Sequence, residues 1–397
     1  MLTLDKVFKA QMVLKSLIRE TDVVKAHGRI APDCDLYLKP ENLQFTGSFK
    51  IRGAAYKISM LSDEEKKRGV IACSAGNHAQ GVALAATKSG IHSLICLPDS
   101  APISKIEATK AFGADVCLVE GVYDDAYKKA LELRDSEGYT FVHPFDDEYV
   151  IAGQGTIALE ILQELDDIDA IVVPVGGGGL ISGIAYTVKQ IRPSVKVYGV
   201  QVAGAPSMYQ SIKDGKIECL PAVSTFADGI AVKQPGPNTF ALVRDYVDEI
   251  ALVSDDEVCG AILALIERQK MVAEGAGAAA VAAVMADKFD LKGKRVVAVV
   301  SGGNIDVTSL SRVIDRGLLN AGRAFSLPIE IIDRPGQLKE IAGIIAQCGG
   351  NITSVHYEKG LTQNVGERLV RIEMETRDFD HINQITQALK DNGFSIL

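Results

Sequence analysis

Hydrophobic residues between positions 70 and 137 form short continuous runs that alternate with stretches of helical spacing. The runs are "GVIAC", "HSLICL" and "DVCLVE", and helical spacing follows each of them, after His78, from Ser104 and over 123–137. Short Val/Ile-rich runs that alternate with helices are typical of buried parallel strands joined by crossover helices. This part of the chain therefore predicts an α/β lobe with a parallel sheet.

The same alternation returns after a break at "HPFDD". Further strands are predicted at "AIVVPV" (170–175), "VKVYGVQ" (195–201) and "RVVAVVSGGN" (295–304). We expect these strands to form a second α/β lobe, with a cleft between the two. The smaller lobe, at about 46–145, is expected to be inserted in the larger one.

The pattern changes near residue 322. Strands are predicted at "FSLPIEII", "GNITSVHYEK" (350–359), "ERLVRIEMET" and "FSIL", and helices at "PGQLKEIAGIIAQ" and "DHINQITQALKDNG". In "ERLVRIEMET" apolar and charged residues alternate, as a half-buried strand requires. The resulting order, βαββαβ, is that of a ferredoxin-like unit. We therefore expect two domains, 1–322 and 323–397.

Charge and composition restrict the kind of partner and the compartment. The formal net charge is −9, and basic residues are scattered among acidic ones, which argues against nucleic acid or an anionic membrane as partner. Seven cysteines without a Cys-x-x-Cys pair indicate a reducing cytoplasm. The N-terminal 20 residues lack the apolar core of a signal peptide, and no segment is long and apolar enough to predict a membrane span. We expect a cytoplasmic protein that binds a small molecule.

A glycine-rich segment, "PVGGGGLISG" (174–183), follows a predicted strand and opens a predicted helix. Consecutive glycines allow backbone N–H groups to converge on an anion at the start of a helix. A dinucleotide site is disfavoured, because no G-x-G-x-x-G can be aligned here and the next strand ends in Gln201 rather than an acidic residue. A single phosphate, as on pyridoxal phosphate, fits better; a simple packing turn of glycines is the alternative.

Two other strand ends carry polar residues. In "CSAGNHAQG" (73–81), Ser74, Asn77 and the amides at the helix start suit a carboxylate, although Ser and Asn are also common helix caps, and His78 alone is read as structural. In "VVSGGN" (299–304), Ser301 lies at the strand tip, where the alternative is an ordinary turn.

Lys50, in "TGSFKIRGA" (46–54), completes this set. A lysine is usually a solvated surface charge. Here three strand ends elsewhere supply a phosphate cradle, a carboxylate site and a partner for a ring nitrogen. A lysine amine is the nucleophile that joins such an aldehyde cofactor through a Schiff base.

The ordered segments "SFKIRGA", "SAGNHAQG", "GGGGLISG" and "SGGN" resemble the fold-type II pyridoxal-phosphate enzymes, a two-lobed fold similar to tryptophan synthase β. The resemblance is closest to the threonine ammonia-lyases (threonine dehydratases) and covers roughly residues 1–322. The remainder, with "DRPGQL" at 333–338, resembles an ACT domain, a small module that senses amino acids.

The resemblance implies a role for each matching position. Lys50 would hold the cofactor and then take the Cα proton of the substrate, Phe49 would pack beside the pyridine ring, and Ser301 would face the ring nitrogen. The phosphate loop would be Gly176, Gly177, Gly178, Gly179 and Leu180. The substrate carboxylate loop would be Ser74, Ala75, Gly76, Asn77 and His78, with Asn77 also bonded to the ring 3-hydroxyl.

The resemblance also implies a reaction. A hydroxyl group such as that of Ser301 leaves the ring nitrogen largely neutral and the electron sink weak. A weak sink favours loss of a β-substituent. The expected reaction is β-elimination of water from L-threonine, and from L-serine, giving 2-oxobutanoate or pyruvate and ammonia.

Four positions bear on related activities. Serine racemase resembles this chain but has a second serine where Ala75 stands, so racemisation would lack its second proton carrier. Gln201 and Ser207 replace the carboxylates of the racemase-like metal site, so no divalent metal is expected there. Glu274 is either an acid near the cofactor or a charge at a helix N-terminus; both readings stay open.

Several alternatives remain open. A serine racemase-like enzyme, a β-replacing enzyme such as cysteine synthase, and an amino-acid sensor with an inactive catalytic lobe are the competing hypotheses. The ACT-like unit implies allosteric control by an amino-acid effector bound between paired copies, hence a homodimer or homotetramer. A role in isoleucine synthesis or in threonine breakdown is compatible with the sequence, and a single ACT-like unit leans towards breakdown.

Overall fold

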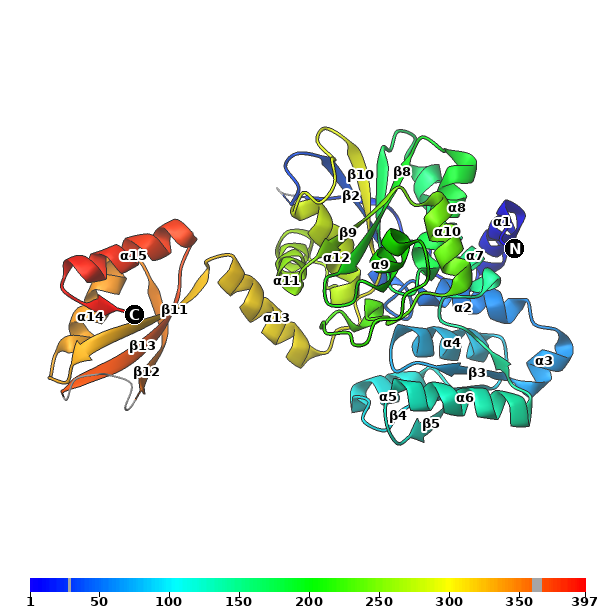
Figure 1. The fold of residues 1–397 in the computed structure, drawn as a ribbon, viewed down its shortest axis with the longest axis horizontal. Helices are drawn as coiled ribbons and strands as arrows, with labels where there is room; N and C mark the ends of the chain where they lie inside the picture. The colour runs from blue at the N-terminus through cyan, green and yellow to red at the C-terminus, as the bar shows by residue number, and fades with distance from the viewer. Residues whose placement is uncertain (28–29, 359–365) are drawn as a thin grey trace. The chain divides into compact units, whose positions relative to one another are not determined.

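The computed structural model describes residues 1–27, 30–358 and 366–397. Two compact units are distinguished, Met1–Val307 and Thr308–Leu397 (Figure 1). The division falls at the start of helix α13 (Val307–Asn320), whereas the boundary expected from the sequence follows that helix. Each unit is described by itself below.

Among the described residues, the first unit contains a six-stranded sheet in the order β1-β2-β10-β7-β8-β9. Only β1 runs antiparallel, to β2, and all the other pairings are parallel. The strands are β1 (Val24–Lys25), β2 (Asp35–Pro40), β7 (Ala170–Pro174), β8 (Lys196–Val202), β9 (Glu249–Val253) and β10 (Arg295–Val300). Strands β7 and β10 are almost entirely buried, as their continuous apolar runs predict.

A second sheet in this unit, again counted over the described residues, has four parallel strands in the order β5-β4-β3-β6. They are β3 (Val70–Cys73), β4 (Ser93–Pro98), β5 (Asp115–Val119) and β6 (Thr140–Phe141), with α4 (Asn77–Lys88), α5 (Ile103–Ala111) and α6 (Tyr123–Glu137) around them (Figure 1). The predicted two-lobed α/β fold is confirmed.

Closely packed helices connect the two sheets. Helix α7 (Glu148–Glu164) lies against both α2 (Lys50–Ser59) and α8 (Gly179–Ile191). The approach of α7 to α8 is so close that a Cβ atom on Gly183 would lie 2.3 Å from the carbonyl oxygen of Ile151. The remaining helices are α1 (Leu4–Leu14), α3 (Asp63–Arg68), α9 (Ser207–Asp214), α10 (Pro237–Tyr246), α11 (Asp255–Ala264) and α12 (Gly275–Met285). Single turns are η1 (Glu41–Leu43), η2 (Asp228–Ile230) and η3 (Leu265–Gln269).

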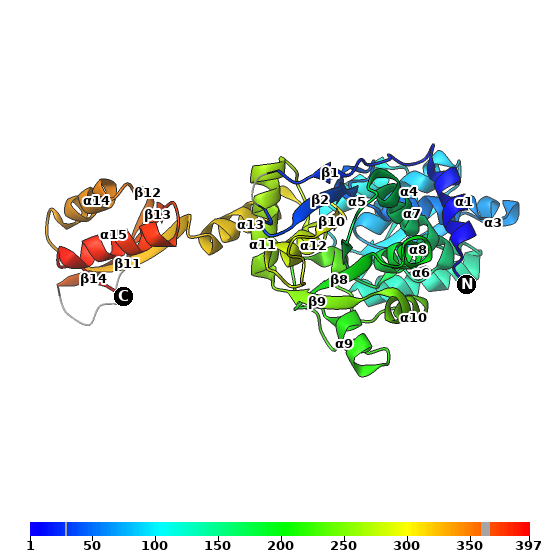
Figure 2. The ribbon, with the colours of Figure 1, turned by 90° about the horizontal axis from the view of Figure 1, so that it is seen from above.

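Helix α12 is built almost wholly of alanine, glycine and valine, and nearly all of it is buried. A helix that is apolar on every side belongs in the interior of a protein. It packs against β10, and both elements can be followed in Figure 2. This packing brings the N-terminus of α12 close to the loop that follows β10.

Four charged side chains are buried together beside helix α2, which begins at Lys50. Arg52, two residues further along α2, forms hydrogen bonds with both carboxylate oxygens of Glu41 and of Glu160, at 2.5 to 2.8 Å. Lys39 forms an ion pair with Glu160 at 2.7 Å and donates to the Thr21 carbonyl oxygen. The two positive and two negative charges balance, which is the condition for keeping them out of water. The cluster attaches α2 to α7 and to the end of β2.

In the second unit an antiparallel sheet of four strands, in the order β12-β13-β11-β14, is found among the described residues. Its elements are β11 (Ala324–Ile332), α14 (Gln337–Gln347), β12 (Asn351–Glu358), β13 (Glu367–Glu375), α15 (Phe379–Asp391) and β14 (Ser395–Ile396). The core is formed by Ile329, Ile345, Val370, Ile372 and Leu389. The βαββαβ order is as predicted; the last residue of the strand predicted at 350–359 lies outside the described residues.

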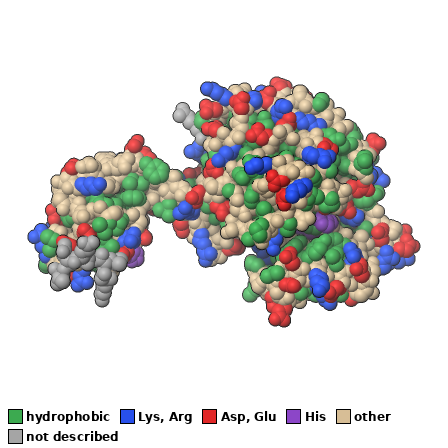
Figure 3. All heavy atoms as spheres, in the orientation of Figure 1, with side chains coloured by type: hydrophobic (Ala, Val, Ile, Leu, Met, Phe, Trp, Pro, Cys, Tyr) green, Lys and Arg blue, Asp and Glu red, His purple; other side chains and the backbone are tan. Residues whose placement is uncertain are grey.

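Basic and acidic side chains are mixed on the face of the molecule that Figure 3 draws, where Lys and Arg are interspersed with Asp and Glu. Within the described residues, no helix combines the length and the apolar character needed to cross a membrane.

Candidate active site

Lys50 begins α2 at the place where two distant loops meet. Ser48 forms an isolated antiparallel bridge with Gly302, and the Phe49 N–H donates to the Ser301 carbonyl oxygen at 3.1 Å. In addition, the Gly303 N–H donates to the Gly47 carbonyl oxygen at 2.9 Å. The segment that carries Lys50 is therefore paired directly with the loop after β10.

Lys50 is half-buried, and its ammonium group has close neighbours in the protein. Its Nζ atom donates to the Pro144 carbonyl oxygen at 2.8 Å and lies 5.2 Å from the centre of the Phe49 ring. Burial lowers the pKa of Lys50 to about 8, and the nearby Glu274 opposes the shift. An amine with a lowered pKa is neutral in part near neutral pH, which is what a nucleophile or a proton acceptor requires.

Asn77 is the first residue of α4 and lies close to two polar side chains of the larger lobe. Its Nδ2 atom donates to Glu274 Oε1 at 2.6 Å, and its Oδ1 atom accepts from Asn304 Nδ2 at 2.7 Å. Glu274 is 5% exposed, and burial, with a contribution from Asp228, raises the pKa of its carboxyl group to about 7 against Asn77, Lys105 and Lys50. The site therefore combines an amide, an amine and a carboxyl group with a raised pKa.

Ser74, Ala75 and Gly76 form the turn between β3 and α4, and Asn77 and His78 are the first two residues of the helix. The Gly76 N–H donates to Ser74 Oγ at 3.1 Å, and α4 has no side-chain cap, so its first amides are free of a capping side chain. Ser74, Ala75, Gly76 and Asn77 are partly exposed. A helix start of this kind favours an anion.

His78 differs from the residues just before it because its ring is buried. The Nε2 atom lies 2.8 Å from the Val142 carbonyl oxygen, to which it donates. Burial and the nearby Lys50 lower the pKa of His78 to about 3, so the ring is neutral at physiological pH. This contact matches the structural reading that the isolated histidine favoured in the sequence.

The glycine segment lies between β7 and α8, and its surroundings exclude side chains. A Cβ atom on Gly177 would lie 2.4 Å from the Phe145 ring, and one on Gly178 would lie 2.9 Å from Cβ of Thr239. Gly178 has φ of 96°, a conformation that favours glycine, and α8 begins at the next residue. The glycines therefore let this backbone pack closely against Phe145 and Thr239 where α8 begins.

Ser301 directly follows β10 and is 2% exposed. Its Oγ atom donates to the Ala276 carbonyl oxygen of α12 at 3.4 Å, a long contact. The strand ends and loops thus bring Lys50, Asn77, Glu274 and Ser301 into one connected region of the first unit.

Sequence reasoning did not single out two of the residues that hold this region. Asn304 bonds Asn77, and Thr239 donates through Oγ1 to the Gly177 carbonyl oxygen at 2.6 Å. Asn304 belongs to the "SGGN" segment that contains Ser301, so its position at the same strand end was a usable signal. No comparable pattern surrounds Thr239.

The positions considered for a metal ion carry other contacts. Gln201 is buried, and its Oε1 atom accepts from the Tyr209 N–H at 2.7 Å. Ser207 is the first residue of α9. Across residues 1–27, 30–358 and 366–397, no group of three or more His, Cys, Asp or Glu side chains is arranged to hold a metal ion.

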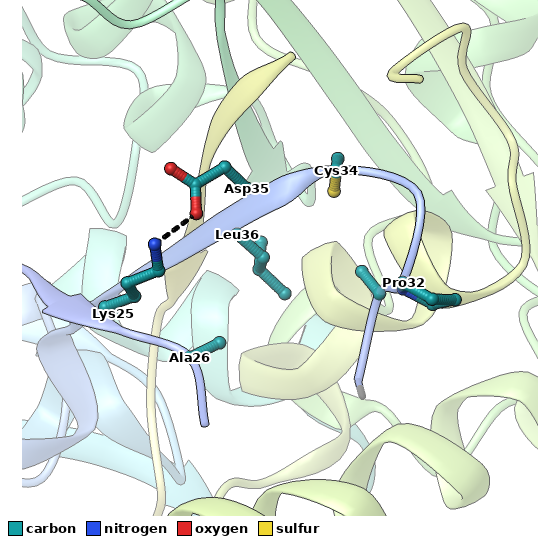
Figure 4. A pocket seen from close by; sticks show the side chains of 7 residues that line it. Lys25, Ala26, Pro32, Cys34, Asp35 and Leu36 are labelled. Atoms are coloured by element: carbon teal, nitrogen blue, oxygen red, sulfur yellow. Dashed lines mark ion pairs between the residues drawn. The ribbon is translucent and has the colours of Figure 1, made fainter. Parts of the chain in front are cut away.

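A separate pocket lies beside β1 and β2. It is lined by Lys25, Ala26, Ala31, Pro32, Cys34, Asp35 and Leu36, and Figure 4 shows the ion pair between Lys25 and Asp35, at 2.6 Å. None of the predicted site residues lines it. The pocket therefore does not belong to the region around Lys50.

Comparison with known proteins defines the class to which this fold and site belong. Residues 14–302 match the family described as pyridoxal-phosphate dependent enzyme. The chain therefore belongs to the family of pyridoxal-phosphate-dependent enzymes, and its cofactor is pyridoxal phosphate.

Individual relatives are similar over most of the chain. The chain is 48% identical to an L-threonine ammonia-lyase of Thermotoga maritima, over 100% of this chain and 99% of that protein. Among solved structures, threonine deaminase isoform 2 of Solanum lycopersicum is 39% identical with a TM-score of 0.74, over 79% of this chain and 93% of its own. Maize serine racemase is 35% identical with a TM-score of 0.75, over 80% and 98% of the two chains.

Proposed function

We propose that the protein is an L-threonine ammonia-lyase that eliminates water from L-threonine and, as a second substrate, L-serine. Threonine loses its β-hydroxyl group as water, and hydrolysis of the released enamine gives 2-oxobutanoate and ammonia; serine gives pyruvate. The observation that carries the proposal is the pairing of the Lys50 segment with the Ser301 loop, which brings a lysine of lowered pKa to a buried strand end. The full-length similarity to the Thermotoga maritima enzyme supports the choice of substrate.

The residues of the region suit the cofactor. Pyridoxal phosphate, when bound, supplies an aldehyde that accepts the amino group and a ring that withdraws electrons from Cα. The backbone of Gly176, Gly177, Gly178, Gly179 and Leu180 would hold its phosphate, because the four glycines carry no side chain and the segment includes the start of α8. Phe49 would lie beside the ring, Asn77 would bond its 3-oxygen, and Ser301 would face its nitrogen.

Lys50 would hold and move the proton in this reaction. With a pKa of about 8, its amine is neutral in a useful fraction of molecules near neutral pH and can accept the Cα proton. The helix start at Ser74, Ala75, Gly76, Asn77 and His78 would bind the substrate carboxylate through its amides and the Ser74 hydroxyl group. Binding of the carboxylate there would fix the substrate in relation to Lys50.

The test is keto-acid formation from L-threonine by the purified protein supplied with pyridoxal phosphate. Lys50→Ala is expected to abolish the product. Lys57→Ala, a change at the other end of the same helix, is the matched control and is expected to retain activity, because the Lys57 ammonium bonds Asp147 at 2.7 Å. Equal activity of the wild type and Lys50→Ala would refute the role of Lys50.

Two alternatives are decided by the same preparation. Sulfide consumption with O-acetylserine, without keto acid from threonine, would favour the β-replacing enzyme. Absence of a lysine-bound chromophore would favour the amino-acid sensor with an inactive catalytic lobe.

Racemisation is the alternative suggested by the similarity to maize serine racemase. A two-base racemase needs a proton carrier on each face of Cα. Ala75 has no proton to give, so we expect no D-serine from L-serine. Chiral analysis of serine recovered from the reaction tests this, and D-serine at a rate comparable with pyruvate would make racemisation the main activity.

Regulation is proposed for the C-terminal part. Residues 1–322 would form the catalytic domain and 323–397 an ACT-like domain that binds an amino-acid effector in a cytoplasmic homodimer or homotetramer. Coupling between such sites is typically about 1 to 3 kcal/mol. Deletion of 324–397 should remove the response of the rate to isoleucine, valine and serine while the basal rate remains; an unchanged response would place the sensor elsewhere.

A further inference from the structure

Glu274 occupies the N-cap position of α12, but its side chain does not cap the helix. A carboxylate at this position would ordinarily accept from the first backbone N–H groups of the helix. Instead the side chain is buried, and Oε1 accepts a hydrogen bond of 2.6 Å from Asn77 Nδ2. The helix-charge reading of Glu274 therefore does not account for where its carboxylate lies.

The orientation of the Asn77 amide follows from a chain of hydrogen bonds that begins at a backbone carbonyl. The Thr46 carbonyl oxygen can only accept, so the atom of Asn304 that lies 2.7 Å away is its amide nitrogen. The same nitrogen lies 2.7 Å from Asn77, which must present its oxygen there. The Asn77 nitrogen therefore points to the Glu274 carboxylate, which accepts.

These hydrogen bonds use only one of the two N–H groups of the Asn77 amide. An amide nitrogen carries two hydrogens, and Glu274 takes one of them. The other is available for an acceptor on the ligand side of Asn77. Rotation of the amide by half a turn would place two donors, on Asn304 and Asn77, against each other and two oxygens, on Asn77 and Glu274, in contact.

The surroundings allow little displacement of Glu274. A Cβ atom on Gly302 would lie 2.4 Å from Glu274 Oε1 and 3.2 Å from Asn77 Nδ2, and one on Gly229 would lie 3.3 Å from the same oxygen. Glycine at these two positions leaves the space that the carboxylate and the amide occupy. Asn77 belongs to the lobe of the four-stranded sheet, whereas Glu274 and Asn304 adjoin the six-stranded sheet, so the network also links the lobes.

We propose that Glu274 and Asn304 are positioning residues for Asn77: they hold its amide so that the second N–H faces the ring oxygen of the cofactor. The inference rests on the placement of the cofactor at Asn77 in the proposed function. A donor held in place before binding contributes more affinity than one that must be ordered on binding. Glu274 thus acts on the cofactor through Asn77 and not by direct proton transfer.

The test is a double-mutant cycle on cofactor affinity, measured without substrate. The dissociation constant of pyridoxal phosphate is determined by visible absorbance for the apoprotein of the wild type, Glu274→Ala, Asn77→Ala and the double variant. Loss of one ordered hydrogen bond predicts an increase of about tenfold for Glu274→Ala in the native background. In the Asn77→Ala background the same change should alter the constant by less than about twofold.

Two further variants separate positioning from other roles. Glu274→Gln keeps an oxygen that can accept from Asn77, so it should recover most of the affinity lost in Glu274→Ala. A group needed only for proton transfer would leave the affinity unchanged in both variants. Asn304→Ala should weaken binding in the native background and not in the Asn77→Ala background. Asn392→Ala, an exposed asparagine of the second unit, is the matched control and should leave affinity unchanged.

The outcomes are distinct. Equal fold-changes for Glu274→Ala in both backgrounds, or no change in either, would overturn the inference. If Glu274→Ala does not fold, as judged by the circular dichroism of the apoprotein, Glu274→Gln and Asn304→Ala complete the cycle. A wild type that binds pyridoxal phosphate without forming keto acid from threonine would refute the proposed function and leave this result unaffected.

Discussion

Replacing Arg52 by methionine tests how much the buried cluster of Arg52, Lys39, Glu41 and Glu160 contributes to stability. The guanidinium group is fully buried and forms hydrogen bonds with Glu41, Glu160 and Thr156. Methionine has a similar length but supplies neither charge nor donors. The substitution leaves two buried carboxylates facing one ammonium group, that of Lys39.

The magnitude follows from the imbalance of charge. Removing one partner of a buried ion pair costs about 3 to 5 kcal/mol. The unfolding entropy is about 2.1 cal/mol/K per residue, so for the unit that ends at Val307 each kcal/mol lowers the melting temperature by about 1.5 °C. Arg52→Met should therefore lower the melting temperature of the apoprotein by roughly 5 to 8 °C.

The pH of the measurement matters because Glu41 takes part. Burial alone would raise the pKa of Glu41, but Arg52, Lys39 and Thr21 outweigh it and hold that pKa below its ordinary value of 4.5. A lowered carboxyl pKa contributes stability above the unfolded pKa, and the contribution is lost as the pH falls through the folded value. Measurements near pH 7 therefore keep the full effect.

Thermal unfolding followed by circular dichroism, with two comparison variants, completes the experiment. Arg134→Met removes an exposed pair with Asp135 and should lower the melting temperature much less than Arg52→Met does. Arg52→Met combined with Glu160→Gln restores the charge balance and should be more stable than Arg52→Met alone. The reasoning fails if Arg52→Met costs no more than Arg134→Met, or if the double variant is less stable than the single one.

Three further predictions follow from local geometry. Gly183→Ala should lower the free energy of unfolding by about 1 to 3 kcal/mol, because its Cβ would lie 2.3 Å from a carbonyl oxygen of α7. Gly260→Ala should raise the free energy of unfolding by about 0.5 to 1 kcal/mol, because no atom lies within 4 Å of the added Cβ. Melting temperatures that change in the same direction in both variants would contradict this prediction. The rate of cofactor incorporation should rise as the pH passes through about 8, where Lys50 loses its proton. The free energy of unfolding of the apoprotein should also rise between pH 8 and pH 10.5, because in this range the unfolded chain still binds the proton that the folded protein has lost. Profiles without either rise would exclude the lowered pKa. Lys105→Met should change the free energy of unfolding by less than about 1 kcal/mol in a urea titration, because Asp228, its partner at 2.5 Å, is 62% exposed; a larger loss would refute this estimate.

The strands and the fold class were accessible from the sequence because their signal is local. The stretches 170–174 and 296–300 within two of the predicted strands are continuously apolar, as strands covered on both faces require, and they lie in β7 and β10. The alternation around Ile372 likewise predicted a strand with one buried face, and Val370, Ile372 and Met374 are buried in β13.

The sequence also named the polar residues at strand ends, but not their partners. Parallel strands collect the loops at their carboxyl ends on one side of a sheet, so Ser74, Asn77 and Ser301 could be identified as candidates from their positions alone. Which residues bond them depends on how the two lobes meet. Lys50 could be singled out as a possible nucleophile, whereas its lowered pKa required the surrounding structure.

Order along the chain thus determined the elements, the fold class and the candidate residues, since these depend on the periodicity of a few neighbouring positions. Tertiary structure alone decided that Glu274 turns away from its own helix to Asn77, that Asn304 orients the same amide, and that Arg52 is buried among carboxylates. Burial and hydrogen bonding between residues far apart in the sequence set charge states and amide orientations. A local pattern cannot specify them, because it carries no information on which distant side chains will be neighbours.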